Sequence, residues 1–298
     1  MGNPNFLSRP RRFGKSLLLS TIEAYFQKKS IYSKGWQSPK ENRNGMCILY
    51  CICEKYDTQQ GLFDILERQL TDWEKLYNIN GAGSHFGRFI TIIEKAFRDS
   101  GQHVVVLIDE HDKPLLHTFH NEALQQSFRE LLTAFYSVLK TADQWSHFVL
   151  ITGITKFAQM DIFSNLNQLK DISFDSRFVE ICGMTRTEIE QNFPEGLQVM
   201  VEDRKMTYPQ VIEELAQRYD GYHFEEEQTE CMFNPFSVLK ALSNKRFKDY
   251  WFASGTPTFL VEMLEQTSYD LRNLDGVSVY ASSLMDDQAD SNNPIPMI

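Results

Sequence analysis

Two hydrophobic patterns alternate along the first half of the chain. Short, nearly continuous apolar runs, typical of strands buried on both faces, lie at 5–8, 46–53, 104–109, 148–152 and 178–182. Segments whose apolar residues recur three and four positions apart, typical of amphipathic helices, lie at 15–28, 62–76, 86–97 and 122–140. Strands that alternate with helices in this way imply an α/β fold, with a parallel sheet flanked by helices.

The pattern changes in the second half of the chain. Thr185 and Glu188 match a capping box, T-x-x-E, which begins a helix, and helical periodicity dominates from there onward. We therefore expect a first domain at 1–183 and a mostly helical second domain at 184–298, which could act as a lid. Its last stretch, 285–298, is acidic and then rich in proline, so we expect it to be loosely ordered.

Composition narrows the class of protein. The 298 residues, 42% of them hydrophobic, can bury one substantial core and a second, smaller one. No apolar stretch approaches the ~20 residues of a membrane span, and no charged segment followed by an apolar one opens the chain. We therefore expect no membrane partner and a cytoplasmic location. The formal net charge of −10 disfavours direct binding of nucleic acid, which stays an alternative.

A basic loop followed by Gly-Lys-Ser is the first candidate for chemistry. Four cations fall within the seven residues from Arg9 to Lys15, between an apolar lead-in and a helical pattern. A helix N-terminus attracts phosphate through its free amides and its dipole, so cations beside it point to a polyphosphate ligand. We assign Lys15 to the terminal phosphates and Ser16 to Mg²⁺. Further contacts with the nucleotide are expected from Arg11, Arg12, Phe13, Gly14 and Leu17.

The second candidate follows the five apolar residues 104–108. A carboxylate at a strand end can hold Mg²⁺, and its neighbour can polarise an attacking water; we assign these roles to Asp109 and Glu110. Thr152 closes the next strand and could sense the terminal phosphate, or could simply cap the strand with its hydroxyl. Lys156 is either a phosphate cation or a surface lysine. Strand ends of a parallel sheet converge at one edge, so these side chains are expected to meet.

Five blocks of sequence occur in an order that resembles a known family. They are FLSRPRRFGKSLLLSTIEAYF, VVVLIDEHDKPLL, LITGITKFAQMDIFSNLNQLKDIS, FNPFSVLKAL and SGTPTFLVEML. Together they resemble the bacterial AAA-ATPase-like proteins over nearly the whole chain. The resemblance implies a P-loop NTPase that binds ATP and Mg²⁺, with Gly-Lys-Ser as the end of the Walker A motif and Asp-Glu as the end of Walker B. It also implies that the glutamate of Walker B is catalytic.

Proteins of that family usually continue into a PD-(D/E)xK nuclease-like domain, and they usually carry a segment before the first strand. The chain therefore looks shortened. We expect the nuclease-like domain to be absent, because the Glu-x-Lys of its core occurs nowhere in the sequence.

One position departs from the general P-loop pattern. Arg9 stands five residues before Gly14, where a glycine is usual, and a side chain there restricts positive φ and close approach to phosphate. We expect a Mg²⁺-dependent ATPase that acts as a switch or motor for an effector, as a monomer or a homo-oligomer. Two alternatives stay open: an ATP-sensing module with little hydrolysis, and the ATPase part of a nuclease-linked nucleic-acid-processing or defence system. GTP is disfavoured because no Asn-Lys-x-Asp motif occurs.

Overall fold

The computed structural model describes residues 3–27, 48–52, 58–118, 121–154, 168–225 and 230–250. These residues divide into two compact units. The sheet unit contains the described residues of 3–8 and 16–171. The helical unit contains 9–15 and the described part of 172–257. Each unit is described by itself.

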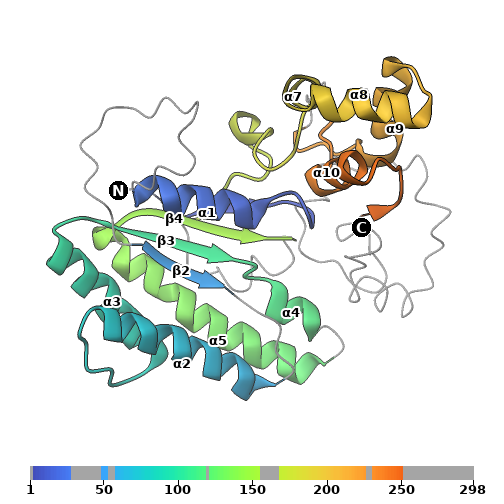
Figure 1. Cartoon of the computed structure of the whole chain (residues 1–298). Helices are drawn as coiled ribbons and strands as arrows, with labels where there is room; N and C mark the ends of the chain where they lie inside the picture. The colour runs from blue at the N-terminus through green and yellow to red at the C-terminus, as the bar shows by residue number, and fades with distance from the viewer. Residues whose placement is uncertain are drawn as a thin grey trace. The chain divides into compact units, whose positions relative to one another are not determined.

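The sheet unit is built on five parallel strands (Figure 1). In spatial order these are β2 (Ile48–Ile52), β3 (Val104–Asp109), β4 (Ser146–Gly153), β1 (Asn5–Ser8) and β5 (Lys170–Asp171). All six residues of β3 are buried, which explains why this strand is an uninterrupted apolar run rather than an alternating one. The expected α/β fold with a parallel sheet flanked by helices is confirmed.

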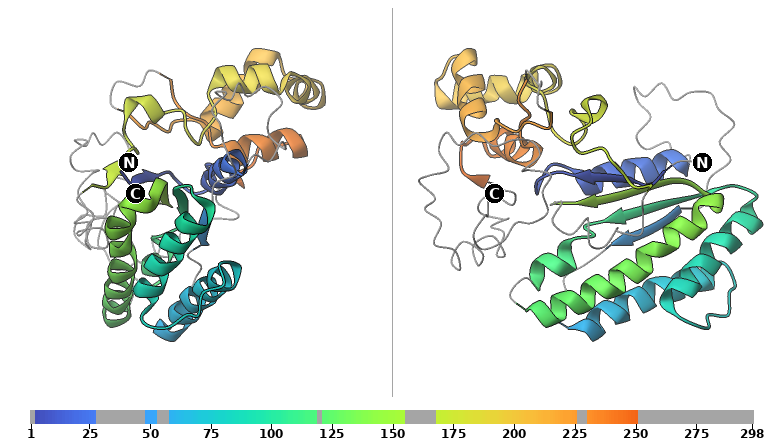
Figure 2. Two further views of the ribbon diagram at one scale, coloured as in Figure 1. Left: turned by 90° about the vertical axis from the view of Figure 1, so that its left-hand side faces the viewer. Right: turned by 180° about the vertical axis from the view of Figure 1, so that it is seen from behind.

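Helices cover both faces of this sheet (Figures 1 and 2). The helices α2 (Gln59–Leu76), α3 (His85–Ser100) and α5 (Glu122–Thr141) lie on one face, and α1 (Lys15–Phe26) lies on the other. The long helices begin at polar caps, since the Thr58, Ser84 and Asn121 side chains accept hydrogen bonds from amides of the first turn. A short helix, α4 (Lys113–His117), follows β3 and was not predicted from the sequence.

Aromatic side chains form the centre of the core between the sheet and its helices. The rings of Phe89 and Phe135 are stacked with centroids 4.7 Å apart, and Trp73 stacks on Phe89 at 5.6 Å. These rings come from α2, α3 and α5, which therefore pack as one layer. The same core contains Val106 and Ile108 of β3, so the strand that carries Asp109 at its end is held rigidly.

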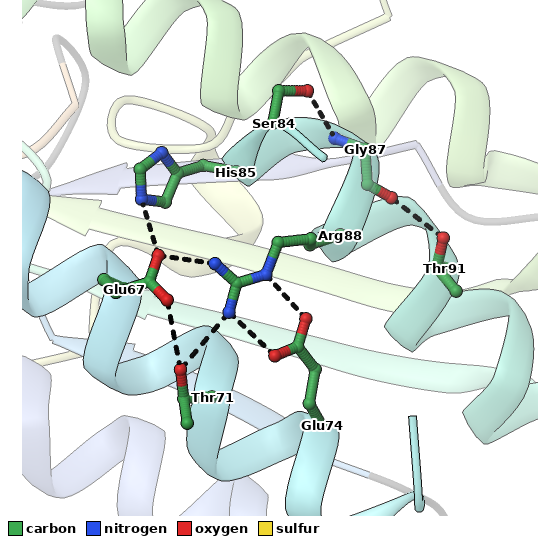
Figure 3. A network of polar contacts seen from close by, with 8 residues as sticks. All are labelled: Glu67, Thr71, Glu74, Ser84, His85, Gly87, Arg88 and Thr91. Carbon is green, nitrogen blue, oxygen red and sulfur yellow. Dashed lines mark hydrogen bonds and ion pairs between the residues drawn. The ribbon is translucent and has the colours of Figure 1, made fainter. Parts of the chain in front are cut away.

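A polar network joins α2 to α3 (Figure 3). The buried Arg88 guanidinium donates to both carboxylate oxygens of Glu74, at 2.6 and 2.7 Å, and to Glu67 at 2.5 Å. The hydrogen bond from Arg88 lowers the pKa of Glu67, and the bonds to Glu74 raise the pKa of Arg88. Gly81 lies so close that a Cβ atom on it would be 2.3 Å from the Glu74 carboxylate. The backbone at Gly81 therefore packs directly against the Glu74 carboxylate, which Arg88 holds in place.

The helical unit, whose helices Figure 2 shows, has its own apolar core. It contains α7 (Arg186–Asn192), α8 (Pro194–Arg204), α9 (Tyr208–Tyr219) and α10 (Pro235–Asn244). The predicted capping box at the start of α7 is confirmed. Two antiparallel bridges, Met184 with Phe233 and Tyr222 with Met232, hold the segments between the helices. The core side chains include Leu197, Met200, Leu215, Phe233 and Val238.

The predicted strand at 178–182 is wrong. The segment begins with a short 3-10 helix, η3 (Ser176–Phe178), and continues as turns, because its carbonyl groups accept hydrogen bonds from a side chain rather than from a neighbouring strand. The described sheet instead gains β5, which pairs with β1. The division into functional domains at 1–183 and 184–298 stays a prediction, and 285–298 lies outside the described residues.

Candidate functional site

The loop between β1 and α1 has the backbone of a tight anion-binding turn. Gly14 has a φ of +90°, and a Cβ atom added there would meet no other atom within 4 Å. Glycine is therefore needed for the backbone conformation and not for lack of space. Arg12 also adopts a left-handed conformation, with a φ of 71°, which is strained for a residue with a side chain. Alternating left-handed residues turn successive amides toward one point.

Lys15 is the first residue of α1, and its side chain folds back over the loop. Its Nζ donates to the carbonyl oxygens of Arg9 at 2.8 Å and Pro10 at 3.1 Å. Only 7% of the residue is exposed. The ammonium group is thus held at the start of the helix, at the point where a phosphate would meet the helix dipole.

Asp109 brings together three of the predicted residues. It ends β3, is buried, and accepts a hydrogen bond from Ser16 Oγ at 2.6 Å through one carboxylate oxygen. Its other oxygen accepts from Thr152 Oγ1, also at 2.6 Å. Both distances are typical of charge-assisted hydrogen bonds from a hydroxyl to a carboxylate. The ends of β3 and β4 and the start of α1 therefore meet at one carboxylate.

Glu110 follows in a left-handed conformation with a φ of 52°. This conformation costs a residue with a side chain about 1–3 kcal/mol, and such strain is concentrated at functional positions. Its half-buried carboxylate accepts a hydrogen bond from Lys113 Nζ at 2.5 Å. The Glu110 side chain is thus held by Lys113, the first residue of α4.

Three neighbours of the site, His111, Asp112 and Gly153, were assigned no catalytic or ligand-binding role from the sequence. The His111 amide donates to the Thr152 carbonyl at 3.0 Å, and the Asp112 carboxylate accepts from the Ile154 amide at 2.7 Å. Gly153 has no room for a side chain, because a Cβ would lie 2.9 Å from His111 Nε2. Burial lowers the pKa of His111 although Asp112 opposes this, so the imidazole is neutral near pH 7. No motif in the sequence marks these contacts.

The remaining residues predicted to contact the nucleotide differ in how much of each is exposed to solvent. Phe13 is 1% exposed and Leu17 is 62% exposed, so Phe13 could reach a nucleotide only through its backbone. The Arg12 guanidinium lies over the ring of Phe236, 4.6 Å from its centre. Arg11 is half-buried in the same loop. Lys156 lies outside the described residues.

The oxygen atoms at this site suit magnesium. A serine hydroxyl and an aspartate carboxylate are hard ligands, and Mg²⁺ usually takes one or two such groups together with phosphate oxygens and water. In the described part of the chain, no group of three or more His, Cys, Asp or Glu side chains could hold a metal ion. A divalent ion at Asp109 would take its remaining ligands from water or from phosphate oxygens.

A parallel sheet, a glycine-containing loop that leads from β1 into a helix, and a buried aspartate at the end of β3, one strand away from β1 across β4, define a P-loop NTPase-like fold. The chain belongs to the AAA-ATPase-like family, described as predicted AAA-ATPases, whose model matches residues 1–163. The match includes Lys15, Ser16, Asp109, Glu110 and Thr152.

A curated relative resembles more of the chain. It is an uncharacterized protein in the vnfD 5′ region of Azotobacter chroococcum mcd 1, and it is 33% identical over 270 residues. The match covers 89% of this chain and 50% of the relative, so the chain spans about half the length of that protein. Within the described residues, no helix is both long enough and apolar enough to cross a bilayer.

Proposed function

We propose that the protein binds ATP together with Mg²⁺ and hydrolyses it to ADP and phosphate. The observation that carries this proposal is the Asp109 carboxylate, which accepts hydrogen bonds of 2.6 Å from both Ser16 and Thr152. Membership of the AAA-ATPase-like family makes nucleotide binding plausible. The contacts at Asp109 supply a chemical reason for it in this chain.

The residues of the loop would bind the polyphosphate. Lys15 would exchange its hydrogen bonds with the Arg9 and Pro10 carbonyls for phosphate oxygens, and the amides of 11–17 would donate to the same group. Ser16 and Asp109 would hold Mg²⁺, directly or through water. The metal ion, when bound, neutralises charge that develops on the phosphate oxygens.

Glu110 is the proposed catalytic base. It directly follows the aspartate proposed to bind the metal ion, and its left-handed backbone is of the strained kind that is concentrated at functional positions. It would accept a proton from the attacking water while one of its oxygens stays hydrogen-bonded to Lys113. Thr152 would sense the terminal phosphate through Asp109, since its hydroxyl donates to that carboxylate.

Hydrolysis would drive a change in an attached effector, as a switch or a motor. A homo-oligomer, a cytoplasmic location and a lid role for the helical unit belong to the same proposal. Each follows from the resemblance or the composition of the chain. Each can be tested separately from ATP binding.

A second candidate function is an ATP-sensing module with little hydrolysis. The ion pair of 2.5 Å between Glu110 and Lys113 favours it, because the Lys113 ammonium group engages one oxygen of the carboxylate that would have to orient the attacking water. The third candidate, the ATPase part of a nuclease-linked nucleic-acid-processing or defence system, rests on the domains that usually follow in the family. A rise in ATPase rate on addition of DNA would support it.

The Glu110→Gln variant separates these candidates. We expect it to bind ATP as the wild type does and to release phosphate about 100-fold more slowly or worse, because a general base contributes about 10²–10⁴ in rate. Glu130→Gln makes the same change at an exposed position of α5 and should retain the wild-type rate. ATP binding without phosphate release in the wild type would instead favour the sensing module.

A further inference from the structure

The loop that would bind phosphate is not part of the compact unit that contains the sheet. Residues Arg9–Lys15 group with the helical unit, although β1 ends at Ser8 and α1 continues from Ser16 within the sheet unit. The reason lies in the side chains of the loop. Two of them, Arg9 and Phe13, are 1% exposed and are buried among residues of the helical unit.

Arg9 uses its whole guanidinium group to hold one segment of that unit. Nε donates to the Ile181 carbonyl at 3.0 Å, Nη1 to the Ser173 carbonyl at 2.8 Å, and Nη2 to the Phe178 carbonyl at 2.9 Å. The group also lies over the ring of Phe224, 4.0 Å from its centre. The planar guanidinium group has N–H donors in fixed directions and can therefore reach three separate carbonyl groups at once, which a lysine ammonium group cannot do in the same geometry. These contacts fix the place of Arg9 in the helical unit.

Phe13 anchors the other end of the loop. Its ring makes edge-on contacts with Tyr222 and Phe224, with centroids 4.6 and 5.6 Å apart, and it belongs to a small core with Phe224 and Met232. Phe224 therefore contacts both anchors, since the Arg9 guanidinium lies over the same ring. The loop is held at two points four residues apart.

The residue proposed to bind phosphate is tied to these anchors. Lys15 Nζ donates to the carbonyl oxygen of Arg9 at 2.8 Å. The backbone of Arg9 therefore accepts a hydrogen bond from Lys15, while the Arg9 side chain donates to carbonyl groups within 173–181. A phosphate that binds Lys15 and the loop amides would order the loop 9–15. Because Arg9 and Phe13 of this loop pack in the helical unit, such ordering would also stabilise the residues that they contact.

We propose that Arg9 and Phe13 are positioning residues through which nucleotide binding and the stability of the helical unit are linked. This inference rests on the proposed binding of ATP at the loop. It assigns to Arg9 a role other than direct contact with phosphate, and it explains why an arginine is compatible with a position where a glycine is usual. By linkage, ATP stabilises the segment 173–181, and loss of the Arg9 anchor weakens ATP binding.

Hydrogen–deuterium exchange of the full chain, with and without Mg²⁺ and the non-hydrolysable analogue β,γ-imido-ATP, tests the first half of the proposal. We expect slower exchange in 173–181 and 230–238 when the analogue is bound. If the wild type binds the analogue and exchange in both segments is unchanged, the proposal is wrong and ATP binding stands. If the wild type does not bind ATP at all, the proposed function itself fails.

Substitutions at Arg9 test the second half. Arg9→Met and Arg9→Lys should weaken binding of the analogue to a similar extent, about tenfold, because neither side chain can hold three carbonyl groups. Arg246→Met removes an exposed arginine of the same unit and should bind as the wild type does. Wild-type affinity in Arg9→Lys would show that charge alone matters and would overturn the anchor. Should the Arg9 variants not fold, the exchange experiment on the wild type still decides the proposal.

Discussion

At the scale of single residues, backbone strain marks the two motifs of the site. Among the described residues that have a side chain, few have a positive φ, and two of these are Arg12 in the loop and Glu110 after β3. Such conformations persist only where surrounding contacts hold them. For Glu110 the contacts are on either side, since Asp109 bonds to Ser16 and Thr152 while the His111 amide bonds to the Thr152 carbonyl.

Substitution of Glu110 by glycine and by alanine should separate strain from function. Neither variant should hydrolyse ATP. Glu110→Gly should be more stable than Glu110→Ala by about 1 kcal/mol, because only glycine adopts the left-handed conformation without cost. Urea denaturation gives the two free energies of unfolding. At Glu130, inside α5, the order should reverse, since glycine weakens a helix. Equal stability of the two Glu110 variants would mean that the backbone there is not strained.

The grouping of Ser16, Asp109 and Thr152 could be predicted from the sequence, because parallel strand ends converge. The burial of Arg9 could not. The sequence of a basic loop is equally consistent with an arginine that binds phosphate and with an arginine that is solvated. Nothing in the loop indicates that Arg9 donates hydrogen bonds to the carbonyl groups of Ser173, Phe178 and Ile181. Its partners lie more than 160 residues away, beyond the range of local patterns.

At the scale of elements, the hydrophobic pattern predicted the strands β1 to β4 and the long helices of the sheet unit. It failed where backbone carbonyl groups accept hydrogen bonds from a side chain, and where a strand is only two residues long. The apolar run 178–182 resembles a strand, yet its segment is bonded to Arg9. The edge strand β5 is only two residues long and is polar, so it leaves no pattern to detect.

The network between α2 and α3 makes Gly81 intolerant of a side chain. A Cβ atom in Gly81→Ala would lie 2.3 Å from a Glu74 oxygen, and Glu74 cannot move without leaving Arg88. We expect a loss of about 1–3 kcal/mol in the free energy of unfolding, measured by chemical denaturation. Gly196→Ala, where the nearest atoms are 3.7 Å away in helix α8, should be neutral or stabilising. A Gly81→Ala variant as stable as the wild type would contradict the fitted network.

The same network should give stability a dependence on acid pH. The hydrogen bond from Arg88 lowers the pKa of Glu67 from its ordinary value of 4.5, so the unfolded chain takes up a proton at Glu67 more readily than the folded one. The stabilising effect of Glu67 is therefore complete above pH 4.5 and lost as pH falls below it. The difference in melting temperature between wild type and Glu67→Gln should shrink from pH 7 to pH 3. A difference that stays constant over this range would exclude the pair as its source.

At the scale of the whole molecule, the loop proposed to bind phosphate is grouped with the helical unit. The loop 9–15 follows a strand of the sheet unit and leads into its helix α1, while its buried side chains belong to the helical unit. Nucleotide binding and the stability of the helical unit would thus be coupled through the contacts of Arg9 and Phe13.

We propose that Gly14, Lys15 and Ser16 form the phosphate-binding part of an ATP site. Calorimetric titration of Mg²⁺-ATP into the wild type and Lys15→Ala tests it most directly, with Lys140→Ala as a control at an exposed lysine of α5. We predict one-site binding by the wild type and the control, and a loss of affinity of about 10–100-fold in Lys15→Ala, the value of a charge-assisted hydrogen bond. Equal affinity of wild type and Lys15→Ala would contradict the claim.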